Sequence, residues 1–356
     1  MARAESVIAS IRPDDDDATM DPNDDAIVRS ILETNSIAKP VEGFRSYGDG
    51  GGDGGDDGDG DGGTPKRVLM HYRDMRTYQT VEFHDRMATK YSFENGKYRC
   101  VLCEVMRLMT IEEAFVELED YVDASDPDMD LPNLLHLLQT AEGIRKSNHP
   151  DWFQLVGLLH DMGKIMFLWG NANDGQDGYA SDENSKQWAL GGDTFVVGCR
   201  IPDEAVVLPR YNRLNPDMAD SRYNTDYGMY EPNCGLDALK FSWGHDEYMY
   251  RMLVANDCLI PREGLDMIRY HSAYPWHDRA SPFLISFSLP RRRGAYRHLM
   301  KPEDYDRIKW VKLFNKFDLY TKDEGNELRG EKMQEELWPY YKGLLDKYGL
   351  GGKLKW

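Results

Sequence analysis

Six histidine and aspartate side chains in this sequence lie beside apolar or aromatic residues. The segment "LLHDMGK", residues 158–164, places two of them next to each other at the end of an apolar run. A buried imidazole or carboxylate costs free energy unless a partner satisfies it, so each needs an explanation. One such histidine is usually a hydrogen-bonded core residue, but four of them with two carboxylates favour a shared partner. In chain order they are His136, His160, Asp161, His245, His271 and Asp318.

A pair of metal ions is the partner that suits this set of ligands. Imidazole and carboxylate without thiolate favour iron, manganese or zinc. His160 and Asp161 are adjacent and cannot point the same way along a helix. At a helix end, however, one can bind a single ion while the other bridges two. The alternative explanation of "LLHDMGK" is a capped helix end, with Lys164 as the favourable terminal cation.

The segments that carry these residues are predicted to be helices. Apolar residues recur with helical spacing in residues 67–92, 109–122, 130–147, 151–161, 241–257, 262–274, 302–322 and 335–349. We therefore predict a mainly α fold with a minor contribution from short β segments. "GDTFVVGC" at 192–199 and "EAVVLP" at 204–209 are the segments predicted to be extended.

Helix-end signals support these boundaries. Thr110 and Glu113 form a capping-box pattern. Asp130 can cap the third helix, with Pro132 in its first turn. Gly163 is expected to end the fourth helix.

Composition limits the classes of partner. The chain has 43 Lys and Arg against 62 Asp and Glu, a formal net charge of −19. That charge argues against nucleic acid and against an anionic membrane surface. The N-terminus lacks a signal-peptide core, and no run of about 18 apolar residues suggests a membrane span. Five cysteines are too few for a disulfide framework, and the Cys100–Cys103 pair lacks a second CxxC, so we expect core cysteines and a cytoplasmic protein.

The chain is predicted to have two parts. Residues 1–65 form an acidic extension whose Gly/Asp-rich tract, 48–63, is expected to be a flexible linker. Residues 66–356 form a single helical domain. Residues 170–187, which are mostly polar and glycine residues, are expected to be a surface loop that could contribute to a lid. We find no pattern of an extended coiled coil or dimer seam, and we expect a monomer.

The order of the histidines and aspartates resembles the HD-domain superfamily, a helical metal scaffold used mostly by metal-dependent phosphohydrolases. Longer segments resemble one family more specifically, the myo-inositol oxygenases. They lie between residues 123 and 322 and are "DASDPDMDLPNLLHLLQTAEGIRK", "DWFQLVGLLHDMGK", "GDTFVVGC", "CGLDALKFSWGHDEYMY", "IRYHSAYPWH" and "FNKFDLYTK". The resemblance implies an HD-type helical bundle.

The resemblance also implies a cofactor and a reaction. Two iron ions, Fe(II) and Fe(III) in the active form, would use O2 to cleave myo-inositol to D-glucuronate and water, without an organic cofactor. Asp161 would bridge the two ions. One iron would bind His136, His160, Asp161 and Asp318, and the other His245, His271 and Asp161.

Further positions are implied as substrate contacts. They are Arg45, Asp123, Ala124, Ser125, Lys164, Gly192, Asp193, His271 and Ser272. Many relatives read "DES" where this chain reads "DAS", so Ala124 cannot supply a side-chain hydrogen bond. Lys164 would act catalytically with Asp161, by stabilising a substrate alkoxide or relaying its proton. Asp246 and Glu247 either orient the metal histidines or form a solvated charged pair.

Two other functions remain as alternatives. An HD-type phosphohydrolase would share the His/Asp core but should bring basic residues to a phosphate; Arg291–Arg293 is the dense basic run. A non-catalytic regulatory HD module would be expected to have a broken ligand set, whereas this set is intact.

Overall fold

Helices form most of the chain that the structure describes, as predicted. The computed structural model describes residues 66–93, 107–118, 121, 123, 133–170, 172–176, 186–277, 295–320 and 330–356, all in the unit that spans residues 40–356. The α-helices are α3 Lys66–Tyr78, α4 Val81–Lys90, α5 Ile111–Glu117, α6 Asn133–Lys146, α7 Asp151–Leu159, α8 His245–Ala255, α9 Arg262–Tyr270, α10 Tyr274–His277, α11 Asp304–Tyr320 and α12 Gly330–Lys347.

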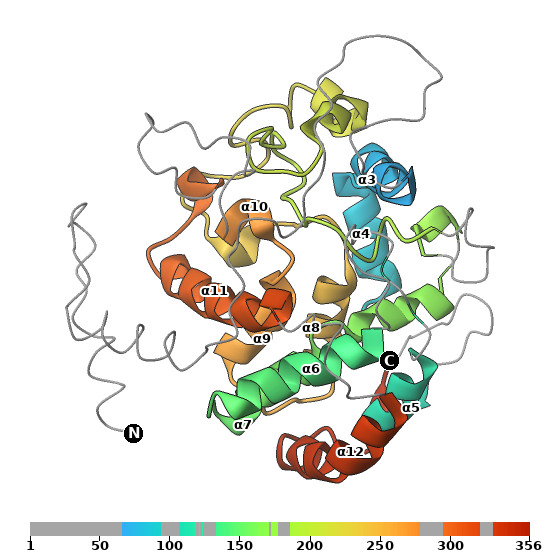
Figure 1. The fold of residues 1–356 in the computed structure, drawn as a ribbon. Helices are drawn as coiled ribbons and strands as arrows, with labels where there is room; N and C mark the ends of the chain where they lie inside the picture. Colours follow the sequence, from blue (N-terminus) through green and yellow to red (C-terminus); the bar gives the residue numbers. More distant parts are fainter. Residues whose placement is uncertain are drawn as a thin grey trace. The chain divides into compact units, whose positions relative to one another are not determined.

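Helices α6, α7, α9 and α11 pack side by side (Figure 1), and α8 packs against α9. Gly157 lets α6 and α7 approach closely, because a Cβ there would lie 2.9 Å from the Cα of Ala141. Leu137, Leu138 and Leu158 are fully buried in the same core. Burying these side chains stabilises the bundle by about 1.5–3 kcal/mol each. The bundle is therefore a rigid scaffold for side chains that point into it.

The first predicted helix, residues 67–92, is two helices. α3 ends at Tyr78 and α4 begins at Val81, with Gln79 and Thr80 between them. Thr80 has an extended backbone, and its hydroxyl accepts a hydrogen bond from the amide of Phe83, which caps α4. The buried Gln79 side chain binds both backbone groups of Trp243. The sequence predicts a single helix because apolar residues continue with helical spacing from α3 into α4, and both helices bury them.

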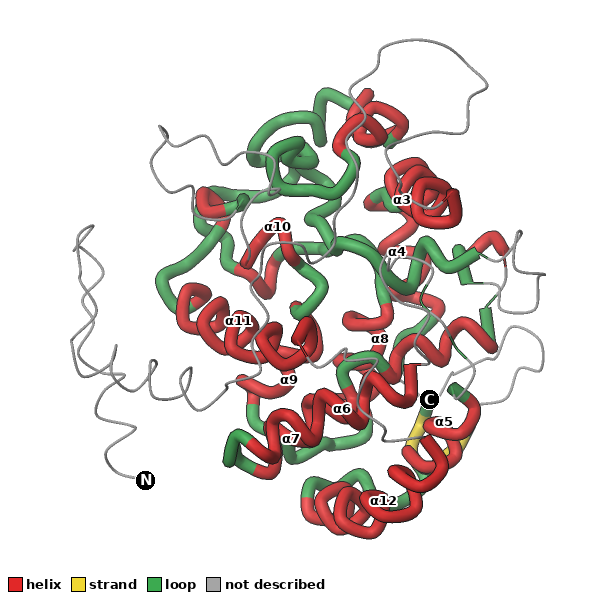
Figure 2. The backbone as a smooth tube through the Cα atoms, viewed as in Figure 1, coloured by secondary structure: helices red, strands yellow, loops and turns green. Residues whose placement is uncertain are grey.

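The predicted strands at 192–199 and 204–209 are wrong. The described strands are β1, Leu108–Met109, and β2, Leu354–Lys355, which pair antiparallel. Residues 191–244 run instead as turns, bends and short 3-10 helices (Figure 2), among them η4, Pro209–Leu214. Amides at 194–197 bond to Ser272, Ser242, Tyr296 and Lys240 in turn. Val196 pairs with Phe241 in a single antiparallel bridge, but the pairing does not extend into a ladder because the amides of Thr194 and Val196 bond to other segments.

Other expectations have mixed outcomes. The capping box of Thr110 and Glu113 is present at the start of α5. The suggested caps of the third helix, Asp130 and Pro132, lie outside the described residues, as do Cys100, Cys103, the Gly/Asp tract and 291–293. Within the described residues, no helix is both long and apolar enough to cross a bilayer. The boundary between residues 65 and 66 stays a prediction, as does the loop at 170–187, whose middle is not described.

Candidate metal centre

All six predicted ligands converge in one buried cluster. His136 lies in the first turn of α6, and His160 and Asp161 directly follow α7. The remaining three lie at helix ends: His245 begins α8, His271 follows α9, and Asp318 lies near the end of α11. Each of the six is at most 6% exposed. The packing of α6, α7, α8, α9 and α11 therefore brings together residues up to 182 positions apart.

One half of the cluster faces Oδ2 of Asp161. The Nε2 atoms of His136 and His160 are 3.2 Å apart and lie 3.8 Å and 3.6 Å from that oxygen. Oδ1 of Asp318 lies 3.0 Å from His136 Nε2 and 3.4 Å from His160 Nε2. Ligands bonded at 2.0–2.2 Å to one ion lie about 3 Å from one another. These four side chains therefore have the spacing of ligands around an ion.

The other half faces Oδ1 of the same aspartate. His245 Nε2 lies 2.9 Å and His271 Nε2 lies 3.4 Å from Asp161 Oδ1, and the two nitrogens are 3.0 Å apart. Asp161 thus presents one oxygen to each pair of histidines. A carboxylate in this position can bridge two ions, whereas a hydrogen-bonded core aspartate has no need of four imidazoles.

The hydrogen bonds on the far side of the rings favour a bound cation. Nδ1 of His160 donates to the carbonyl of Gly157, and Nδ1 of His271 donates to that of Ile268, each at 2.9 Å. Nδ1 of His245 donates to the carbonyl of Leu190. In a neutral imidazole this leaves Nε2 as a lone-pair acceptor. The Nε2 atoms of His245 and His271 lie 3.0 Å apart, and in this tautomer both present lone pairs to one point, as two ligands of a single cation do.

Lys164 adds a positive charge at the edge of the cluster. Its ammonium donates to Oδ2 of Asp161 and to Oδ2 of Asp123, each at 2.8 Å. Burial opposes the charge, but the two carboxylates outweigh burial and raise the pKa of Lys164 well above its usual value. Lys164, together with His160 and His245, likewise holds the pKa of Asp161 well below its usual value against the effect of burial. The ammonium binds carboxylates, so the helix-end alternative does not describe Lys164.

Gly163 does not end α7, contrary to the prediction. The helix ends at Leu159, and the chain continues through His160 and Asp161 into a 3-10 helix, η2, Met162–Leu168. Gly163 is needed for close approach, because a Cβ there would lie 2.0 Å from the carbonyl oxygen of His245. The change from α to 3-10 geometry at this point turns Asp161 and Lys164 toward one another and toward the cluster.

Segment 190–194, which contains the predicted contacts Gly192 and Asp193, is bonded to the ligand-bearing elements. Leu190 accepts from the ring and the amide of His245. The amide of Thr194 donates to the carbonyl of Ser272 at 2.8 Å, and its hydroxyl donates to Asp246 at 3.2 Å. The predicted contacts at 192, 193 and 272 therefore lie on backbone attached to the metal cluster.

Helix α3 holds the other side of this segment. Gly192 has a φ of 96°, and a Cβ there would lie 2.9 Å from the sulfur of Met75. His71 Nε2 contacts the carbonyl of Gly191 at 3.2 Å, and burial lowers the pKa of His71. Arg76 donates from Nη2 to both oxygens of Asp193 at 2.9 Å. His71 and Arg76 are not among the predicted site residues, although both occupy core-facing positions of an amphipathic helix.

The acidic pair after His245 plays neither of its suggested roles. Asp246 is buried and accepts from Thr194 and the amide of Glu247. Glu247 is also buried and forms ion pairs with Arg251 at 2.7 Å and Arg269 at 2.6 Å. The pair is therefore not solvated, and backbone carbonyls rather than these carboxylates orient the rings of His245 and His271.

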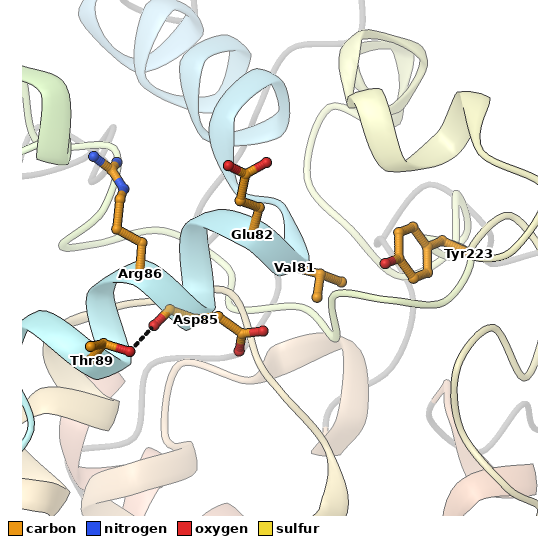
Figure 3. A pocket seen from close by; sticks show the side chains of 6 residues that line it. All are labelled: Val81, Glu82, Asp85, Arg86, Thr89 and Tyr223. Atoms are coloured by element: carbon orange, nitrogen blue, oxygen red, sulfur yellow. Dashed lines mark hydrogen bonds between the residues drawn. The ribbon is translucent and has the colours of Figure 1, made fainter.

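Three predicted contacts, Arg45, Ala124 and Ser125, lie outside the described residues. A separate pocket opens to solvent along α4, and Figure 3 shows the backbone carbonyl of Asp85 accepting from Thr89 at its rim. Its lining residues are Val81, Glu82, Asp85, Arg86, Thr89 and Tyr223. None of them is a predicted site residue, so this pocket does not compete with the histidine cluster as the candidate centre.

Comparisons with known proteins agree with the resemblance seen in the sequence. The family model described as myo-inositol oxygenase matches residues 65–356. The chain is 44% identical to inositol oxygenase of Mus musculus over 323 residues, which cover 90% of this chain and 93% of the mouse protein. It is 39% identical to inositol oxygenase of Homo sapiens over 341 residues, covering 95% and 99% of the two chains. The Dictyostelium discoideum protein of the same name is 38% identical over 316 residues, covering 88% and 89%.

Proposed function

This chain belongs to the myo-inositol oxygenase family, and from that premise we propose that it cleaves myo-inositol with O2, giving D-glucuronate and water, at a pair of iron ions. The observation that carries the proposal is the position of Asp161. Its two oxygens face two separate pairs of histidine Nε2 atoms. This is the arrangement that a two-metal site requires and that a one-metal hydrolytic site does not.

The six ligands would be shared between the two irons according to which oxygen of Asp161 each ligand faces. His136, His160 and Asp318 would hold one ion with Oδ2 of Asp161. His245 and His271 would hold the other with Oδ1, which leaves it fewer protein ligands and more open positions. When bound, the two irons supply the electron-transfer chemistry that O2 requires and lower the pKa of a coordinated hydroxyl.

Lys164 would act on the substrate as a fixed cation. Its ammonium stays protonated because Asp123 and Asp161 raise its pKa. A substrate hydroxyl that loses its proton beside Asp161 would develop negative charge within reach of this ammonium, which would stabilise it. Asp123, on the other side of Lys164, can accept a hydrogen bond from a neighbouring hydroxyl or hold the ammonium in place.

Substrate recognition would rest on hydrogen bonds, because myo-inositol is an uncharged polyol. Asp123, Ser272 and the segment at 192–193 would supply acceptors and donors for its hydroxyls. A site that binds hydroxyls in this way rejects analogues that lack them, because its buried polar groups are then left unpaired. The net charge of −19 does not oppose such a neutral substrate.

The phosphohydrolase alternative is less well supported by the same site. Among the described residues around the cluster, Lys164 is paired with two carboxylates and Arg76 with Asp193. A phosphate, with its two negative charges, would need more cationic groups than these paired side chains supply, whereas the single alkoxide that forms on a neutral polyol needs only one. The regulatory alternative expects missing ligands, whereas all six side chains are present and converge.

The decisive experiment measures O2 uptake by purified, iron-loaded protein with and without myo-inositol, together with the D-glucuronate formed. We expect uptake that depends on myo-inositol, with one D-glucuronate per O2. Zinc-loaded protein is the matched control, because zinc fits imidazole and carboxylate but has no redox chemistry. If uptake does not depend on myo-inositol and phosphate esters are hydrolysed instead, the proposed function is wrong.

We also propose a monomer that works in the cytoplasm. One chain supplies all six ligands, so the site is complete without a partner. Cys199, Cys234 and Cys258 are free thiols, which suits a reducing compartment. Light scattering on the iron-loaded protein should give a mass near 41.0 kDa, and a stable dimer would contradict the first point. Imaging of the tagged protein in cells tests the second.

A further inference from the structure

Helix α3 buries an arginine where its amphipathic pattern calls for an apolar residue. The buried face of the helix consists of Val68, His71, Tyr72, Met75 and Arg76. Arg76 is 0% exposed. A buried guanidinium is costly unless several acceptors satisfy it, so its partners indicate what it is for.

The partners of Arg76 converge on one short stretch. Nη2 donates to both oxygens of Asp193 at 2.9 Å and to the carbonyl of Val207 at 3.1 Å. Nε donates to Oδ1 of Asn212 at 3.0 Å. The guanidinium carbon also lies 4.6 Å from the centre of the Phe195 ring. Arg76 therefore fixes the Asp193 carboxylate in position and orientation at once.

The opposite side of the same stretch is bonded to the metal ligands. Leu190 accepts from His245, and Thr194 donates to Ser272, the neighbour of His271. The segment 190–194 is thus bonded to Arg76 through Asp193 and to the ligand-bearing residues through Leu190 and Thr194. A shift in Arg76 would be passed to the segment whose other end touches the cluster.

We propose that Arg76 is a positioning residue for substrate binding, which aims the Asp193 carboxylate at a hydroxyl of the polyol. The inference rests on the proposed function, since it assumes that the 192–193 segment contacts myo-inositol. Arg76 itself does not touch the substrate. It acts through Asp193 and is best detected in substrate affinity.

The hydrogen bonds of the Asp193 carboxylate keep it an acceptor of fixed orientation. A carboxylate has about four acceptor positions. Arg76 and the amide of Val207, which donates to Oδ2 at 2.8 Å, take three of them. The amide of Asp193 itself also acts on the carboxylate, so a substrate hydroxyl would share an acceptor oxygen with one of these donors. Burial raises the pKa of Asp193 and Arg76 opposes that rise, which helps to keep the carboxylate an acceptor.

Lysine cannot replace arginine here. The guanidinium is a rigid fork with five donors, whereas the lysine ammonium is a compact charge on a flexible stem. Arg76→Lys would keep the charge beside Asp193 but could not also reach Asn212 and Val207. Arg76→Met removes the charge as well. The two variants separate the loss of orientation from the loss of charge.

The test measures KM and kcat for myo-inositol, with iron content and melting temperature for each variant. We expect Arg76→Lys to raise KM by about 10-fold and to change kcat by less than about 3-fold, with normal iron content. Asp193→Asn should raise KM similarly. The double variant Arg76→Lys/Asp193→Asn should be no worse than the more affected single variant, because both act on one interaction.

Arg307→Met is the matched control. Arg307 is also a buried arginine in an ion pair, bonded to Asp266 at 2.7 Å and 2.8 Å, but it does not contact segment 190–194. We expect it to lower the melting temperature and leave KM within about 2-fold of the wild type. This control shows what a purely structural arginine does when it is removed.

Two outcomes would overturn the inference. The first is an unchanged KM in Arg76→Lys and Asp193→Asn protein that keeps its iron. The second is a KM that follows stability alone, so that Arg307→Met raises it as much as Arg76→Lys. If Arg76→Met does not fold, the Arg76→Lys and Asp193→Asn results still decide. Wild-type protein without inositol-dependent O2 uptake would instead refute the proposed function.

Discussion

The ammonium of Lys164 lies 2.8 Å from Oδ2 of Asp161, the carboxylate whose two oxygens divide the histidine cluster into halves. The two residues are three positions apart at the start of a 3-10 helix. The same ammonium also donates a hydrogen bond to Asp123, a predicted substrate contact. Lys164 therefore connects the candidate metal centre to the predicted substrate site. Because Lys164 is not itself a metal ligand, its effect on the reaction can be measured without removing a ligand.

Replacing Lys164 with methionine should leave the metal centre loaded and slow the reaction. The six metal ligands are intact in this variant, but the cation that would stabilise the substrate alkoxide is gone. We expect kcat to fall by about 100-fold or more, the usual cost of a lost charge-stabilising donor. Steady-state O2 uptake and iron analysis of the same sample measure both effects. Lys164→Arg keeps the charge and should lose less. Equal losses in the two variants would contradict a role for the charge.

Replacing His160 with alanine should remove iron as well as activity. His160 is fully buried and faces both Asp161 and Asp318, so no other side chain can take its place. We expect bound iron to fall from about two ions per chain to about one or none, because metal affinity depends on a complete ligand set. Metal analysis after gel filtration measures this.

The control for that variant is His84→Ala. His84 is also buried and bonds a backbone carbonyl, that of Phe241 at 2.7 Å, but lies outside the cluster. It should keep its iron. Full iron content in His160→Ala protein would show that the assigned ligand set is wrong.

Replacing Gly163 with alanine should disturb the centre without removing a ligand. The new Cβ would lie 2.0 Å from the carbonyl oxygen of His245, so the backbone of η2 or α8 must move. We expect a loss of about 3 kcal/mol or more in the free energy of unfolding, together with weaker iron binding. Urea unfolding and metal titration measure the two effects.

Gly343→Ala is the matched control for Gly163→Ala. Gly343 lies in α12, and a Cβ there would meet no atom within 4 Å. Alanine at an exposed helix position should be neutral or stabilise by up to about 1 kcal/mol. A normal melting temperature and iron content in Gly163→Ala protein would mean that η2 and α8 are not in such close contact.

His84 should make the fold less stable in mild acid. Burial lowers the pKa of His84 below its usual value of about 6.5. Between the two pKa values the unfolded chain binds more protons than the folded one, so stability falls as the pH falls. The contribution of neutral His84 to stability is fully present above about pH 6.5. It is lost as the pH falls from there to the pKa of His84 in the folded protein. Each such group contributes at most about 1.4 kcal/mol per pH unit.

The comparison of wild type with His84→Gln tests this linkage. Both proteins are freed of metal, so that metal release does not contribute, and are unfolded with urea between about pH 7.5 and 5.5. The variant should lose less stability over this range. Parallel curves for the two proteins would show that His84 does not titrate with a lowered pKa.

The sequence by itself determined the ligand types and most of the helices. Helical periodicity and capping residues are local properties, so the segments carrying His136, His245 and Asp318 could be predicted as helices. Four histidines and two aspartates beside apolar residues predicted a metal centre because buried polar groups need partners. The resemblance then indicated how the ligands divide.

Tertiary structure alone decided the details that make the site specific. Which oxygen of Asp161 faces which histidines depends on how α7, α8 and α9 pack. The irregular path of 190–194 could not be predicted, because its hydrogen bonds go to segments distant in sequence. The sequence predicts a helix end at Gly163, because the contact of Gly163 with the carbonyl of His245 is not local. The sequence shows that Arg76 lies on the apolar face of its helix, but only the fold shows that Asp193 is its partner.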